Sequence, residues 1–265
     1  MAISKYQNID WTTGVTAVDN IAAANIQSID NIATPSGPPP TNWRSTIYTF
    51  DTQPTQTGAA NDWAPDAAYT ADGWVNGQAC IQGTQWTPGI NAKGWNCDFG
   101  STPSSNTGPG GAMTDFNNPA VTSISTRRYV YKEASSGRNT YDHVARTPGY
   151  NFSTLMTNTS NNLRLVIWHH AYTAPPVGWQ DPLFEVYADT LTTTTKATST
   201  FVFDLPVAGN TNTGFTDPWK LNYVDLNGYR TANQTYYFYI NMGPQNIGTV
   251  WQHDMALDSI YFEEY

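Results

Sequence analysis

"NLRLVIWHHAY", residues 162–172, is the stretch that decides the fold class. It is dense in apolar, β-branched and aromatic side chains, and it contains neither glycine nor proline. Such a run, when turn residues bound it on both sides, predicts a β-strand with at least one buried face.

Runs of the same kind recur along most of the chain. They are separated by clusters of Gly, Pro and Asn, and they cover residues 45–50, 127–134, 183–189, 199–205, 235–242 and 258–265. No amphipathic helical pattern appears after Pro40. Because open sheet edges aggregate, many short strands predict a closed or double-layered all-β domain. We expect one sandwich over residues 41–265, preceded by a separate segment over residues 1–40.

Composition indicates a polar surface that carries few charges. Of the 265 residues, 14% are aromatic and only 12% are charged, where about 25% charged is typical. Thr, Asn, Ser and Gln supply the polarity instead, which suits an extracellular β-protein or a particle component. The net charge is −9 and Arg127-Arg128 is the only basic cluster, so nucleic-acid binding is not expected.

The segment before the proline run contains a near-repeat. Its apolar residues are spaced by three and recur eleven positions later, as Val15, Val18, Ile21 and then Ile26, Ile29, Ile32. Asp residues interrupt every apolar cluster, which argues against a signal peptide and against membrane insertion. The proline-rich residues 34–40 predict a semi-rigid spacer.

Spacing of three fits one helical turn or an extended coil docked on another surface, and residues 22–24, all Ala, fit a short helix. So short a segment buries little of its own surface. The six apolar residues are therefore expected to contact another surface. That surface is either the protein's own domain, with the segment as a strap, or a particle, with the segment as an anchor.

The two cysteines, Cys80 and Cys97, permit two interpretations. In an oxidising medium they form one disulfide, which stabilises the fold by about 3 kcal/mol. In a reducing compartment they are two structural thiols. Without a nearby His pair they do not form a zinc site.

Blocks in the rest of the chain resemble MAM domains, the extracellular jelly-roll modules of receptor phosphatases, neuropilins and meprins. The matching blocks occur in the family's order: "YTFDT", "GWNCDFGSTPSSNTGPGGAM", "RRYVYKEASSGRNTYDHVARTPGYNFS", "NLRLVIWHHAYTAP", "LFEVYAD" and "DMALDSIYF". The resemblance covers about residues 45–265. It implies a non-catalytic jelly-roll β-sandwich, which we expect to follow the extended N-terminal anchoring segment described above.

The N-terminal repeat resembles the leaders of tailed-phage virion proteins. Together the two resemblances predict a virion structural protein on the outer surface of the head or tail, which contacts other virion proteins and copies of itself. The alternative is a glycan-binding adhesin that recognises host-surface glycans, or an extracellular MAM-type domain of a cellular organism.

Carboxylates on the predicted strands are the candidates for an enzyme. A glycosidase needs two across a cleft, and Glu133 with Glu185 is one available pair among Glu133, Glu185, Asp204, Glu263 and Glu264. The resembled family is non-catalytic, so we expect no enzymatic activity. His169 and His170 point to opposite faces of a strand and do not chelate one metal; we expect one buried beside Trp168 and one exposed.

The same resemblance implies a structural calcium ion between the opening and closing strands, with Asp51, Asp254 and Asp258 as its ligands. No other cofactor is expected.

Tryptophans in the predicted loops are the candidates for glycan binding. Aromatic platforms beside Asn and Asp recognise sugars, and the loop residues available are Trp63, Trp74, Trp86, Trp95, Trp179 and Trp219. The same tryptophans can instead fill the core or contact a neighbouring subunit.

Overall fold

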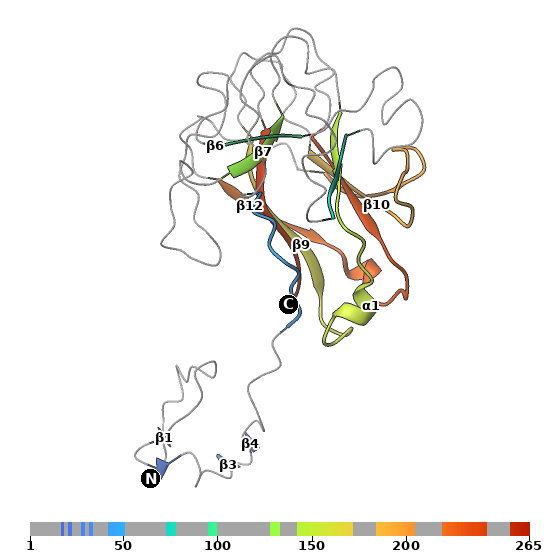
Figure 1. The fold of residues 1–265 in the computed structure, drawn as a ribbon. Coiled ribbons are helices and arrows are strands. Elements are labelled where there is room, and N and C mark those ends of the chain that lie inside the picture. Colours follow the sequence, from blue (N-terminus) through green and yellow to red (C-terminus); the bar gives the residue numbers. More distant parts are fainter. Residues whose placement is uncertain are drawn as a thin grey trace.

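The computed structural model describes residues 42–50, 73–77, 95–99, 128–132, 142–171, 184–204, 219–242 and 255–265, with four two-residue strands before residue 34. The described part is almost entirely β-structure (Figure 1). Its longest strands are β9 (Leu163–Ala171) and β14 (Met255–Glu264), which pair with one another. The predicted strand over residues 162–172 is therefore confirmed, at the centre of a sheet.

Ten strands form two five-stranded antiparallel sheets. The first sheet has the order β11-β10-β13-β8-β5 and the second β12-β9-β14-β7-β6. The remaining strands are β5 (Val75–Asn76), β6 (Asn96–Phe99), β7 (Arg128–Lys132), β8 (His143–Arg146), β10 (Phe184–Asp189), β11 (Thr200–Asp204), β12 (Lys220–Asp225) and β13 (Tyr237–Met242).

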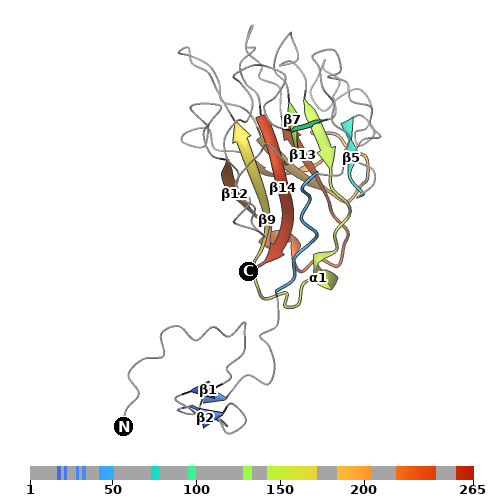
Figure 2. The same ribbon diagram turned by 60° about the vertical axis from the view of Figure 1, so that its left-hand side comes forward.

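The order of the last eight strands is that of a jelly roll. Strands β7, β14, β9 and β12 make one four-stranded layer, and β8, β13, β10 and β11 make the other, while β6 and β5 extend the two edges. Figure 2 shows the sheet of β9 and β14 in front of the sheet of β13. The predicted all-β jelly-roll sandwich is thus confirmed.

The core lies between the sheets and follows from the alternation of side chains along each strand. In β9, Leu163, Leu165 and Ile167 point inward and are fully buried in the main core. Large aromatic residues fill the rest of it, among them Phe184 and Phe238 of the first sheet. Within the described residues, helix is confined to α1 (Phe152–Leu155) and the short 3-10 turn η6 (Asn227–Tyr229), and no helix there is long and apolar enough to cross a membrane.

A β-bulge divides β14 into two halves. Its pairing with β9 shifts register between Asp258 and Tyr261, and Ser259 has a φ of 48°, in the left-handed region. The extra residue reverses the alternation, because Leu257 and Ile260, three positions apart, both lie in the main core. Beyond the bulge, Glu263 therefore faces outward.

Residues 42–50 pair antiparallel with the second half of β14, where β7 no longer does (Figure 2). The N–H of Ser45 donates to the carbonyl of Phe262 at 2.9 Å, and that of Glu264 donates to the carbonyl of Trp43 at 2.9 Å. The predicted strand over residues 45–50 is present as extended chain with isolated bridges, one of them at Tyr48.

The near-repeat forms two short antiparallel pairs. Strand β1 (Ala17–Val18) pairs with β2 (Ile21–Ala22), and β3 (Ser28–Ile29) pairs with β4 (Ile32–Ala33). The predicted short helix over residues 22–24 is wrong at Ala22, which lies in a strand: two apolar positions flanking two turn-forming residues favour a hairpin. Val15 and Ile26 lie outside the described residues, and the anchoring role and the boundary at residue 40 stay predictions.

Candidate functional site

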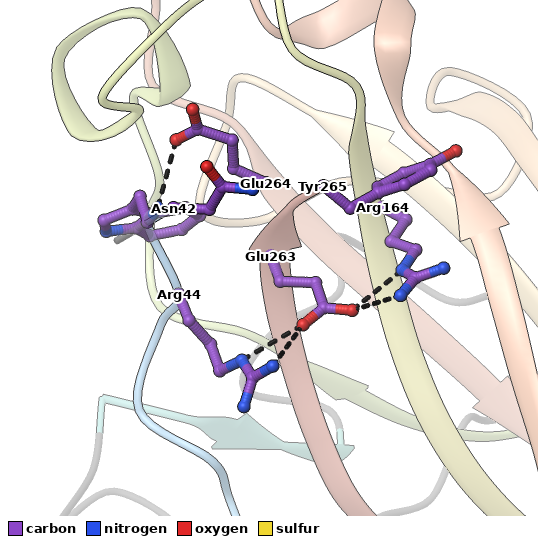
Figure 3. Close-up of a pocket in the computed structure, with 7 residues that line it drawn as sticks. Asn42, Arg44, Arg164, Glu263, Glu264 and Tyr265 are labelled. Carbon is purple, nitrogen blue, oxygen red and sulfur yellow. Dashed lines mark hydrogen bonds and ion pairs between the residues drawn. The ribbon is translucent and has the colours of Figure 1, made fainter. Parts of the chain in front are cut away.

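A pocket of about 540 Å³ lies at the end of the sandwich where β14 finishes (Figure 3). Three parts of the chain form it: the extended segment 42–50, the beginning of β9 and the end of β14. Its lining residues are Asn42, Trp43, Arg44, Arg164, Glu263, Glu264 and Tyr265.

One carboxylate joins two arginines at this pocket. Oε2 of Glu263 accepts hydrogen bonds from Nε and Nη2 of Arg44 at 3.0 and 2.7 Å. Its Oε1 accepts from Nε and Nη2 of Arg164 at 2.8 and 2.6 Å. Figure 3 shows the carboxylate lying between the two guanidinium groups. Each oxygen of Glu263 therefore already accepts two N–H groups, in the fork geometry that makes Arg–carboxylate pairs strong.

Tyrosine rings pack against the same two guanidinium groups. The guanidinium carbon of Arg164 lies 4.0 Å from the ring centre of Tyr223 and 4.3 Å from that of Tyr265. Arg44 lies 5.0 Å from the ring centre of Tyr261. Tyr223 and Tyr265 are each 48% exposed, so their outer faces remain open to a ligand.

Tyr261 is fully buried between these groups. Burial and, to a smaller extent, the Glu263 carboxylate raise the pKa of its hydroxyl to about 12, while Arg44 and Arg164 oppose the rise. Tyr261 is therefore neutral at physiological pH and does not add negative charge to the pocket.

Both arginines retain unused hydrogen-bond donors. Nη1 of Arg44 and Nη1 of Arg164 make no hydrogen bond within the part of the chain that the structure describes. The two side chains are 41% and 24% exposed, so these donors are accessible. The pocket thus presents accessible N–H groups in fixed positions beside open aromatic faces.

Glu264, the next residue, serves the fold. Its carboxylate accepts hydrogen bonds from the backbone N–H groups of Trp43, Thr157 and Asn158 and from the side chains of Thr157 and Asn161. Burial alone raises the pKa of this carboxyl, but the hydrogen bonds outweigh burial and hold the pKa below its ordinary value of 4.5. Glu264 therefore ties segment 42–50 and the turn after α1 to the end of β14.

A second carboxylate cluster lies on the outer face of the first sheet. Oε2 of Glu185 accepts from Nζ of Lys196 at 2.6 Å and from Nδ2 of Asn241 at 2.9 Å. The same amide nitrogen donates to Oδ1 of Asp142 at 2.9 Å. Asp142 and Asn241 are fully buried, and Glu185 is buried. This cluster joins β10, β13 and the residue before β8.

The predicted glycan-binding tryptophans divide into two groups. Trp74 and Trp95 are buried in the main core with ring centres 5.7 Å apart, and Nε1 of Trp95 donates to the carbonyl of His143. Trp219 is buried against Tyr129 on the outer face of the second sheet. These three follow the alternative in which loop tryptophans fill the protein interior. Trp63, Trp86 and Trp179 lie outside the described residues and stay predictions.

The predicted metal and disulfide sites are only partly described. Asp258 is fully buried and its Oδ1 accepts the N–H of Ser259 at 2.5 Å, whereas Asp51 and Asp254 lie outside the described residues. No group of three or more His, Cys, Asp or Glu residues in the described ranges is placed to hold a metal ion. Cys97 lies in β6 and Cys80 is not described. The calcium ion and the disulfide both stay predictions.

The histidine doublet corrects one expectation. His169 and His170 occupy opposite faces of β9, as predicted, but both are fully buried, so the expectation of one exposed histidine is wrong. The reason is that side chains cover the sheet on both faces at this position: His170 contacts the Trp219 ring on the outer face, and His169 contacts Asn222 on the inner one. The proposed Glu133–Glu185 pair stays untested because Glu133 is not described.

Sequence reasoning missed the pocket as a unit. In the sequence, Glu263 and Glu264 are visible only as acids on a predicted strand, and no pattern distinguishes Arg44, Arg164 or Tyr265. One signal was present: Arg164 is the only charged residue in the apolar run at residues 162–168. A charge at that position predicts a partner on an adjacent strand, but not which one.

Comparison with known proteins gives only distant structural matches. No protein-family model matches the chain, and no curated protein matches it. Among solved structures, a cleaved adhesin domain of Lys-gingipain from Porphyromonas gingivalis matches at 17% identity and a TM-score of 0.33, over 84% of this chain and 97% of that one.

Two other solved structures match this chain with similarly low identities and TM-scores. The CBM22-1 and GH10 modules of Clostridium thermocellum endo-1,4-beta-D-xylanase, in complex with xylohexaose, match at 11% identity and a TM-score of 0.35, over 84% of this chain and 29% of that one. A Stig cyclase from Fischerella sp. matches at 11% identity and a TM-score of 0.42, over 85% and 98%. Similarity this low carries no argument about function, and no family model or curated protein supports the resemblance to MAM domains or to phage virion proteins.

Proposed function

We propose that this chain is a non-enzymatic carbohydrate-binding β-sandwich protein, and that the pocket beside Glu263 is its binding site. One observation carries the proposal: the half-exposed ring of Tyr265 and the guanidinium groups of Arg44 and Arg164 line a cavity of about 540 Å³, and the half-exposed ring of Tyr223 packs against Arg164. Sugar rings pack their C–H faces on aromatic rings, and their oxygens accept hydrogen bonds. Small-molecule sites commonly have volumes of about 300–1,000 Å³.

The state of the two glutamates supports a binding role over a catalytic one. A glycosidase needs a carboxylate that is free to exchange a proton or attack the sugar. Both oxygens of Glu263 accept two N–H groups each, and those of Glu264 accept hydrogen bonds from the chain. Neither carboxylate is available for that chemistry.

The proposal includes display on a surface. A sandwich with few charges and many polar uncharged residues suits an extracellular or particle-borne protein, and residues 1–40 are proposed as its anchor. Cell-surface glycans and further copies of the chain are the proposed partners. Location on a phage virion stays a prediction from the N-terminal repeat alone.

Binding of the full-length chain to an array of oligosaccharides tests the proposal, with titration calorimetry on the hits. We expect Tyr265→Ala and Tyr223→Ala each to weaken binding about tenfold or more, because each removes an aromatic face. Phe201→Ala is the matched control, since Phe201 is an equally exposed aromatic residue on the first sheet.

Three results would contradict the proposal: an array without hits, equal losses in the control and the pocket variants, or binding that survives both tyrosine changes. In the last case, loss of binding on Trp63→Ala, Trp86→Ala or Trp179→Ala would move the site to the predicted loops.

A further inference from the structure

We infer that Lys196 and Asn241 react to form an intramolecular isopeptide bond, with Glu185 as the group that carries the proton. The bond joins Nζ of the lysine to Cγ of the asparagine side chain and releases ammonia. In the structure the two side chains are separate, which is the arrangement before the reaction. The inference does not depend on the proposed sugar site, which is formed by the second sheet and residues 42–50.

One carboxylate oxygen brings an amine and an amide together. Oε2 of Glu185 accepts hydrogen bonds from Nζ of Lys196 at 2.6 Å and from Nδ2 of Asn241 at 2.9 Å. The nucleophile, the leaving nitrogen and a group that carries protons therefore meet at a single atom. Reacting groups that a fold holds in a productive arrangement reach effective concentrations of about 10⁵–10⁸ M, and an unactivated amide needs such an advantage to react with an amine.

The reaction balances with these three side chains alone. Glu185 accepts one proton from the Nζ ammonium, and the free amine of Lys196 attacks Cγ of Asn241. The bond between Cγ and Nδ2 breaks as Glu185 passes its proton to Nδ2. The departing ammonia takes up the second Nζ proton and leaves as ammonium. A secondary amide and the carboxylate of Glu185 remain, and because the reaction occurs once per chain it is not enzymatic turnover.

Burial protects the amide from the competing reaction with water. Asn241 is fully buried, and so is Asp142, whose Oδ1 accepts a hydrogen bond from the same Nδ2 at 2.9 Å. Water that reached Cγ would hydrolyse the amide to a carboxylate. Exclusion of water from a reacting group suppresses such side reactions, so the amine of Lys196 is the favoured nucleophile.

The position of Lys196 gives the bond a structural effect. Lys196 lies between β10 and the edge strand β11, and its Nζ lies 5.4 Å from the ring centre of Tyr187 on β10. Glu185 of β10 pairs with Asn241 of β13, the central strand of this sheet. The bond therefore ties the connection before the edge strand to the centre of the sheet, where it opposes local opening of the edge.

The noncovalent contact of Lys196 is weak by itself. Its side chain is 29% exposed, and exposed ion pairs contribute little to stability. A substitution of Lys196 therefore costs little relative to the unreacted chain and more relative to the reacted one.

Intact-mass spectrometry of the full-length chain tests the inference. After incubation of the folded protein at neutral pH, we expect a mass lower by one ammonia. Protease digestion should then release a branched peptide that contains both Lys196 and Asn241, and trypsin should no longer cleave after Lys196. Succinimide formation at an Asn-Gly sequence also releases ammonia, but it leaves the two peptides separate.

Three variants identify the reacting groups. Lys196→Arg keeps a positive charge beside Glu185 but supplies no amine, so it should retain the full mass. Glu185→Gln should also retain the full mass, because it removes the proton carrier. Lys220→Gln, which changes a lysine of the second sheet, is the matched control and should lose ammonia as the native chain does. A melting curve verifies that each variant is folded.

Three results overturn the inference. The first is an unchanged mass of the folded native chain after prolonged incubation. The second is loss of ammonia without a branched peptide, and the third is an equal loss of ammonia in Lys196→Arg. Peptide mapping of the native chain decides the question even where a variant does not fold, and none of these results bears on sugar binding.

Discussion

Glu263 and Glu185 lie on different sheets, and each accepts hydrogen bonds from at least one basic side chain. The two clusters differ in which of their hydrogen-bonding groups stay unused. Around Glu263, two arginines supply four N–H groups to two oxygens and still have accessible donors. Around Glu185, Lys196 and Asn241 share one oxygen, and the Oδ1 of buried Asn241 accepts no hydrogen bond from any residue in the described ranges.

The difference shows which ion-pair cluster is suited to a ligand. Spare donors at the surface can bind an incoming acceptor without any rearrangement. A buried amide between two carboxylates holds strands together, and nothing from solvent reaches it. Exposure of the unused groups, more than the presence of charge, therefore distinguishes the candidate site from the structural cluster.

Glu264→Ala is expected to lower the free energy of unfolding by about 3 kcal/mol, because the N–H groups of Trp43, Thr157 and Asn158 lose the buried carboxylate that accepts their hydrogen bonds. Urea denaturation measures the change. Glu264→Gln keeps one acceptor oxygen and should lose less. Asp225→Ala, which removes an exposed carboxylate at the end of β12, serves as the control, and a loss for Glu264→Ala no larger than the control's would refute the structural role.

Asn241→Leu is expected to cost about 2 kcal/mol, because Asp142 and Glu185 lose the amide that donates to both. Thermal and urea unfolding measure it. Sugar binding should not change, since this cluster belongs to the other sheet. Asn233→Leu, at an exposed turn, is the matched control. If Asn241→Leu impairs binding in a folded protein, the separation of the two regions is wrong.

Arg164→Gln is expected to cost about 1 kcal/mol or less and Lys196→Gln about 0.5 kcal/mol, because both cations are partly exposed. Equilibrium unfolding curves of the two variants, recorded side by side, give the difference. A loss above about 3 kcal/mol for Arg164→Gln would mean that the arginine pair is primarily structural.

Acid should destabilise the protein partly through Glu264. Its folded-state pKa lies below 4.5, so the unfolded chain takes up the proton more readily. The stabilisation is then fully present above pH 4.5 and is lost as the pH falls below that value toward the folded-state pKa. Comparing unfolding free energies of the native chain and Glu264→Gln over this range tests it. Equal pH dependence in the two proteins would contradict the assignment.

Much of the fold was predictable from local patterns. The runs at residues 127–134, 162–172, 183–189 and 235–242 correspond to β7, β9, β10 and β13. Strands β8 and β12 were missed, because "HVAR" and "KLNYVD" are short and carry charges among their apolar residues. Such strands are specified by their neighbours: β8 lies between β13 and β5, and β12 pairs with β9.

The candidate site was much less predictable. The tryptophans were visible as a class, but whether a loop tryptophan is buried depends on the packing around it, and Trp74, Trp95 and Trp219 are buried. The arginines of the pocket had no pattern of their own. Their common feature is a partner on β14, which no local spacing along the chain reveals.

The sequence by itself determined the all-β class and most strands, because alternation and turn residues are properties of neighbouring residues. Only the tertiary structure decided that Arg44 and Arg164, which are 219 and 99 positions from Glu263, meet on one carboxylate. The bulge at Ser259 is the physical reason: by inserting one residue it turns Glu263 outward to the arginines and Glu264 toward the turn after α1. A shift of one residue in that strand would exchange the two.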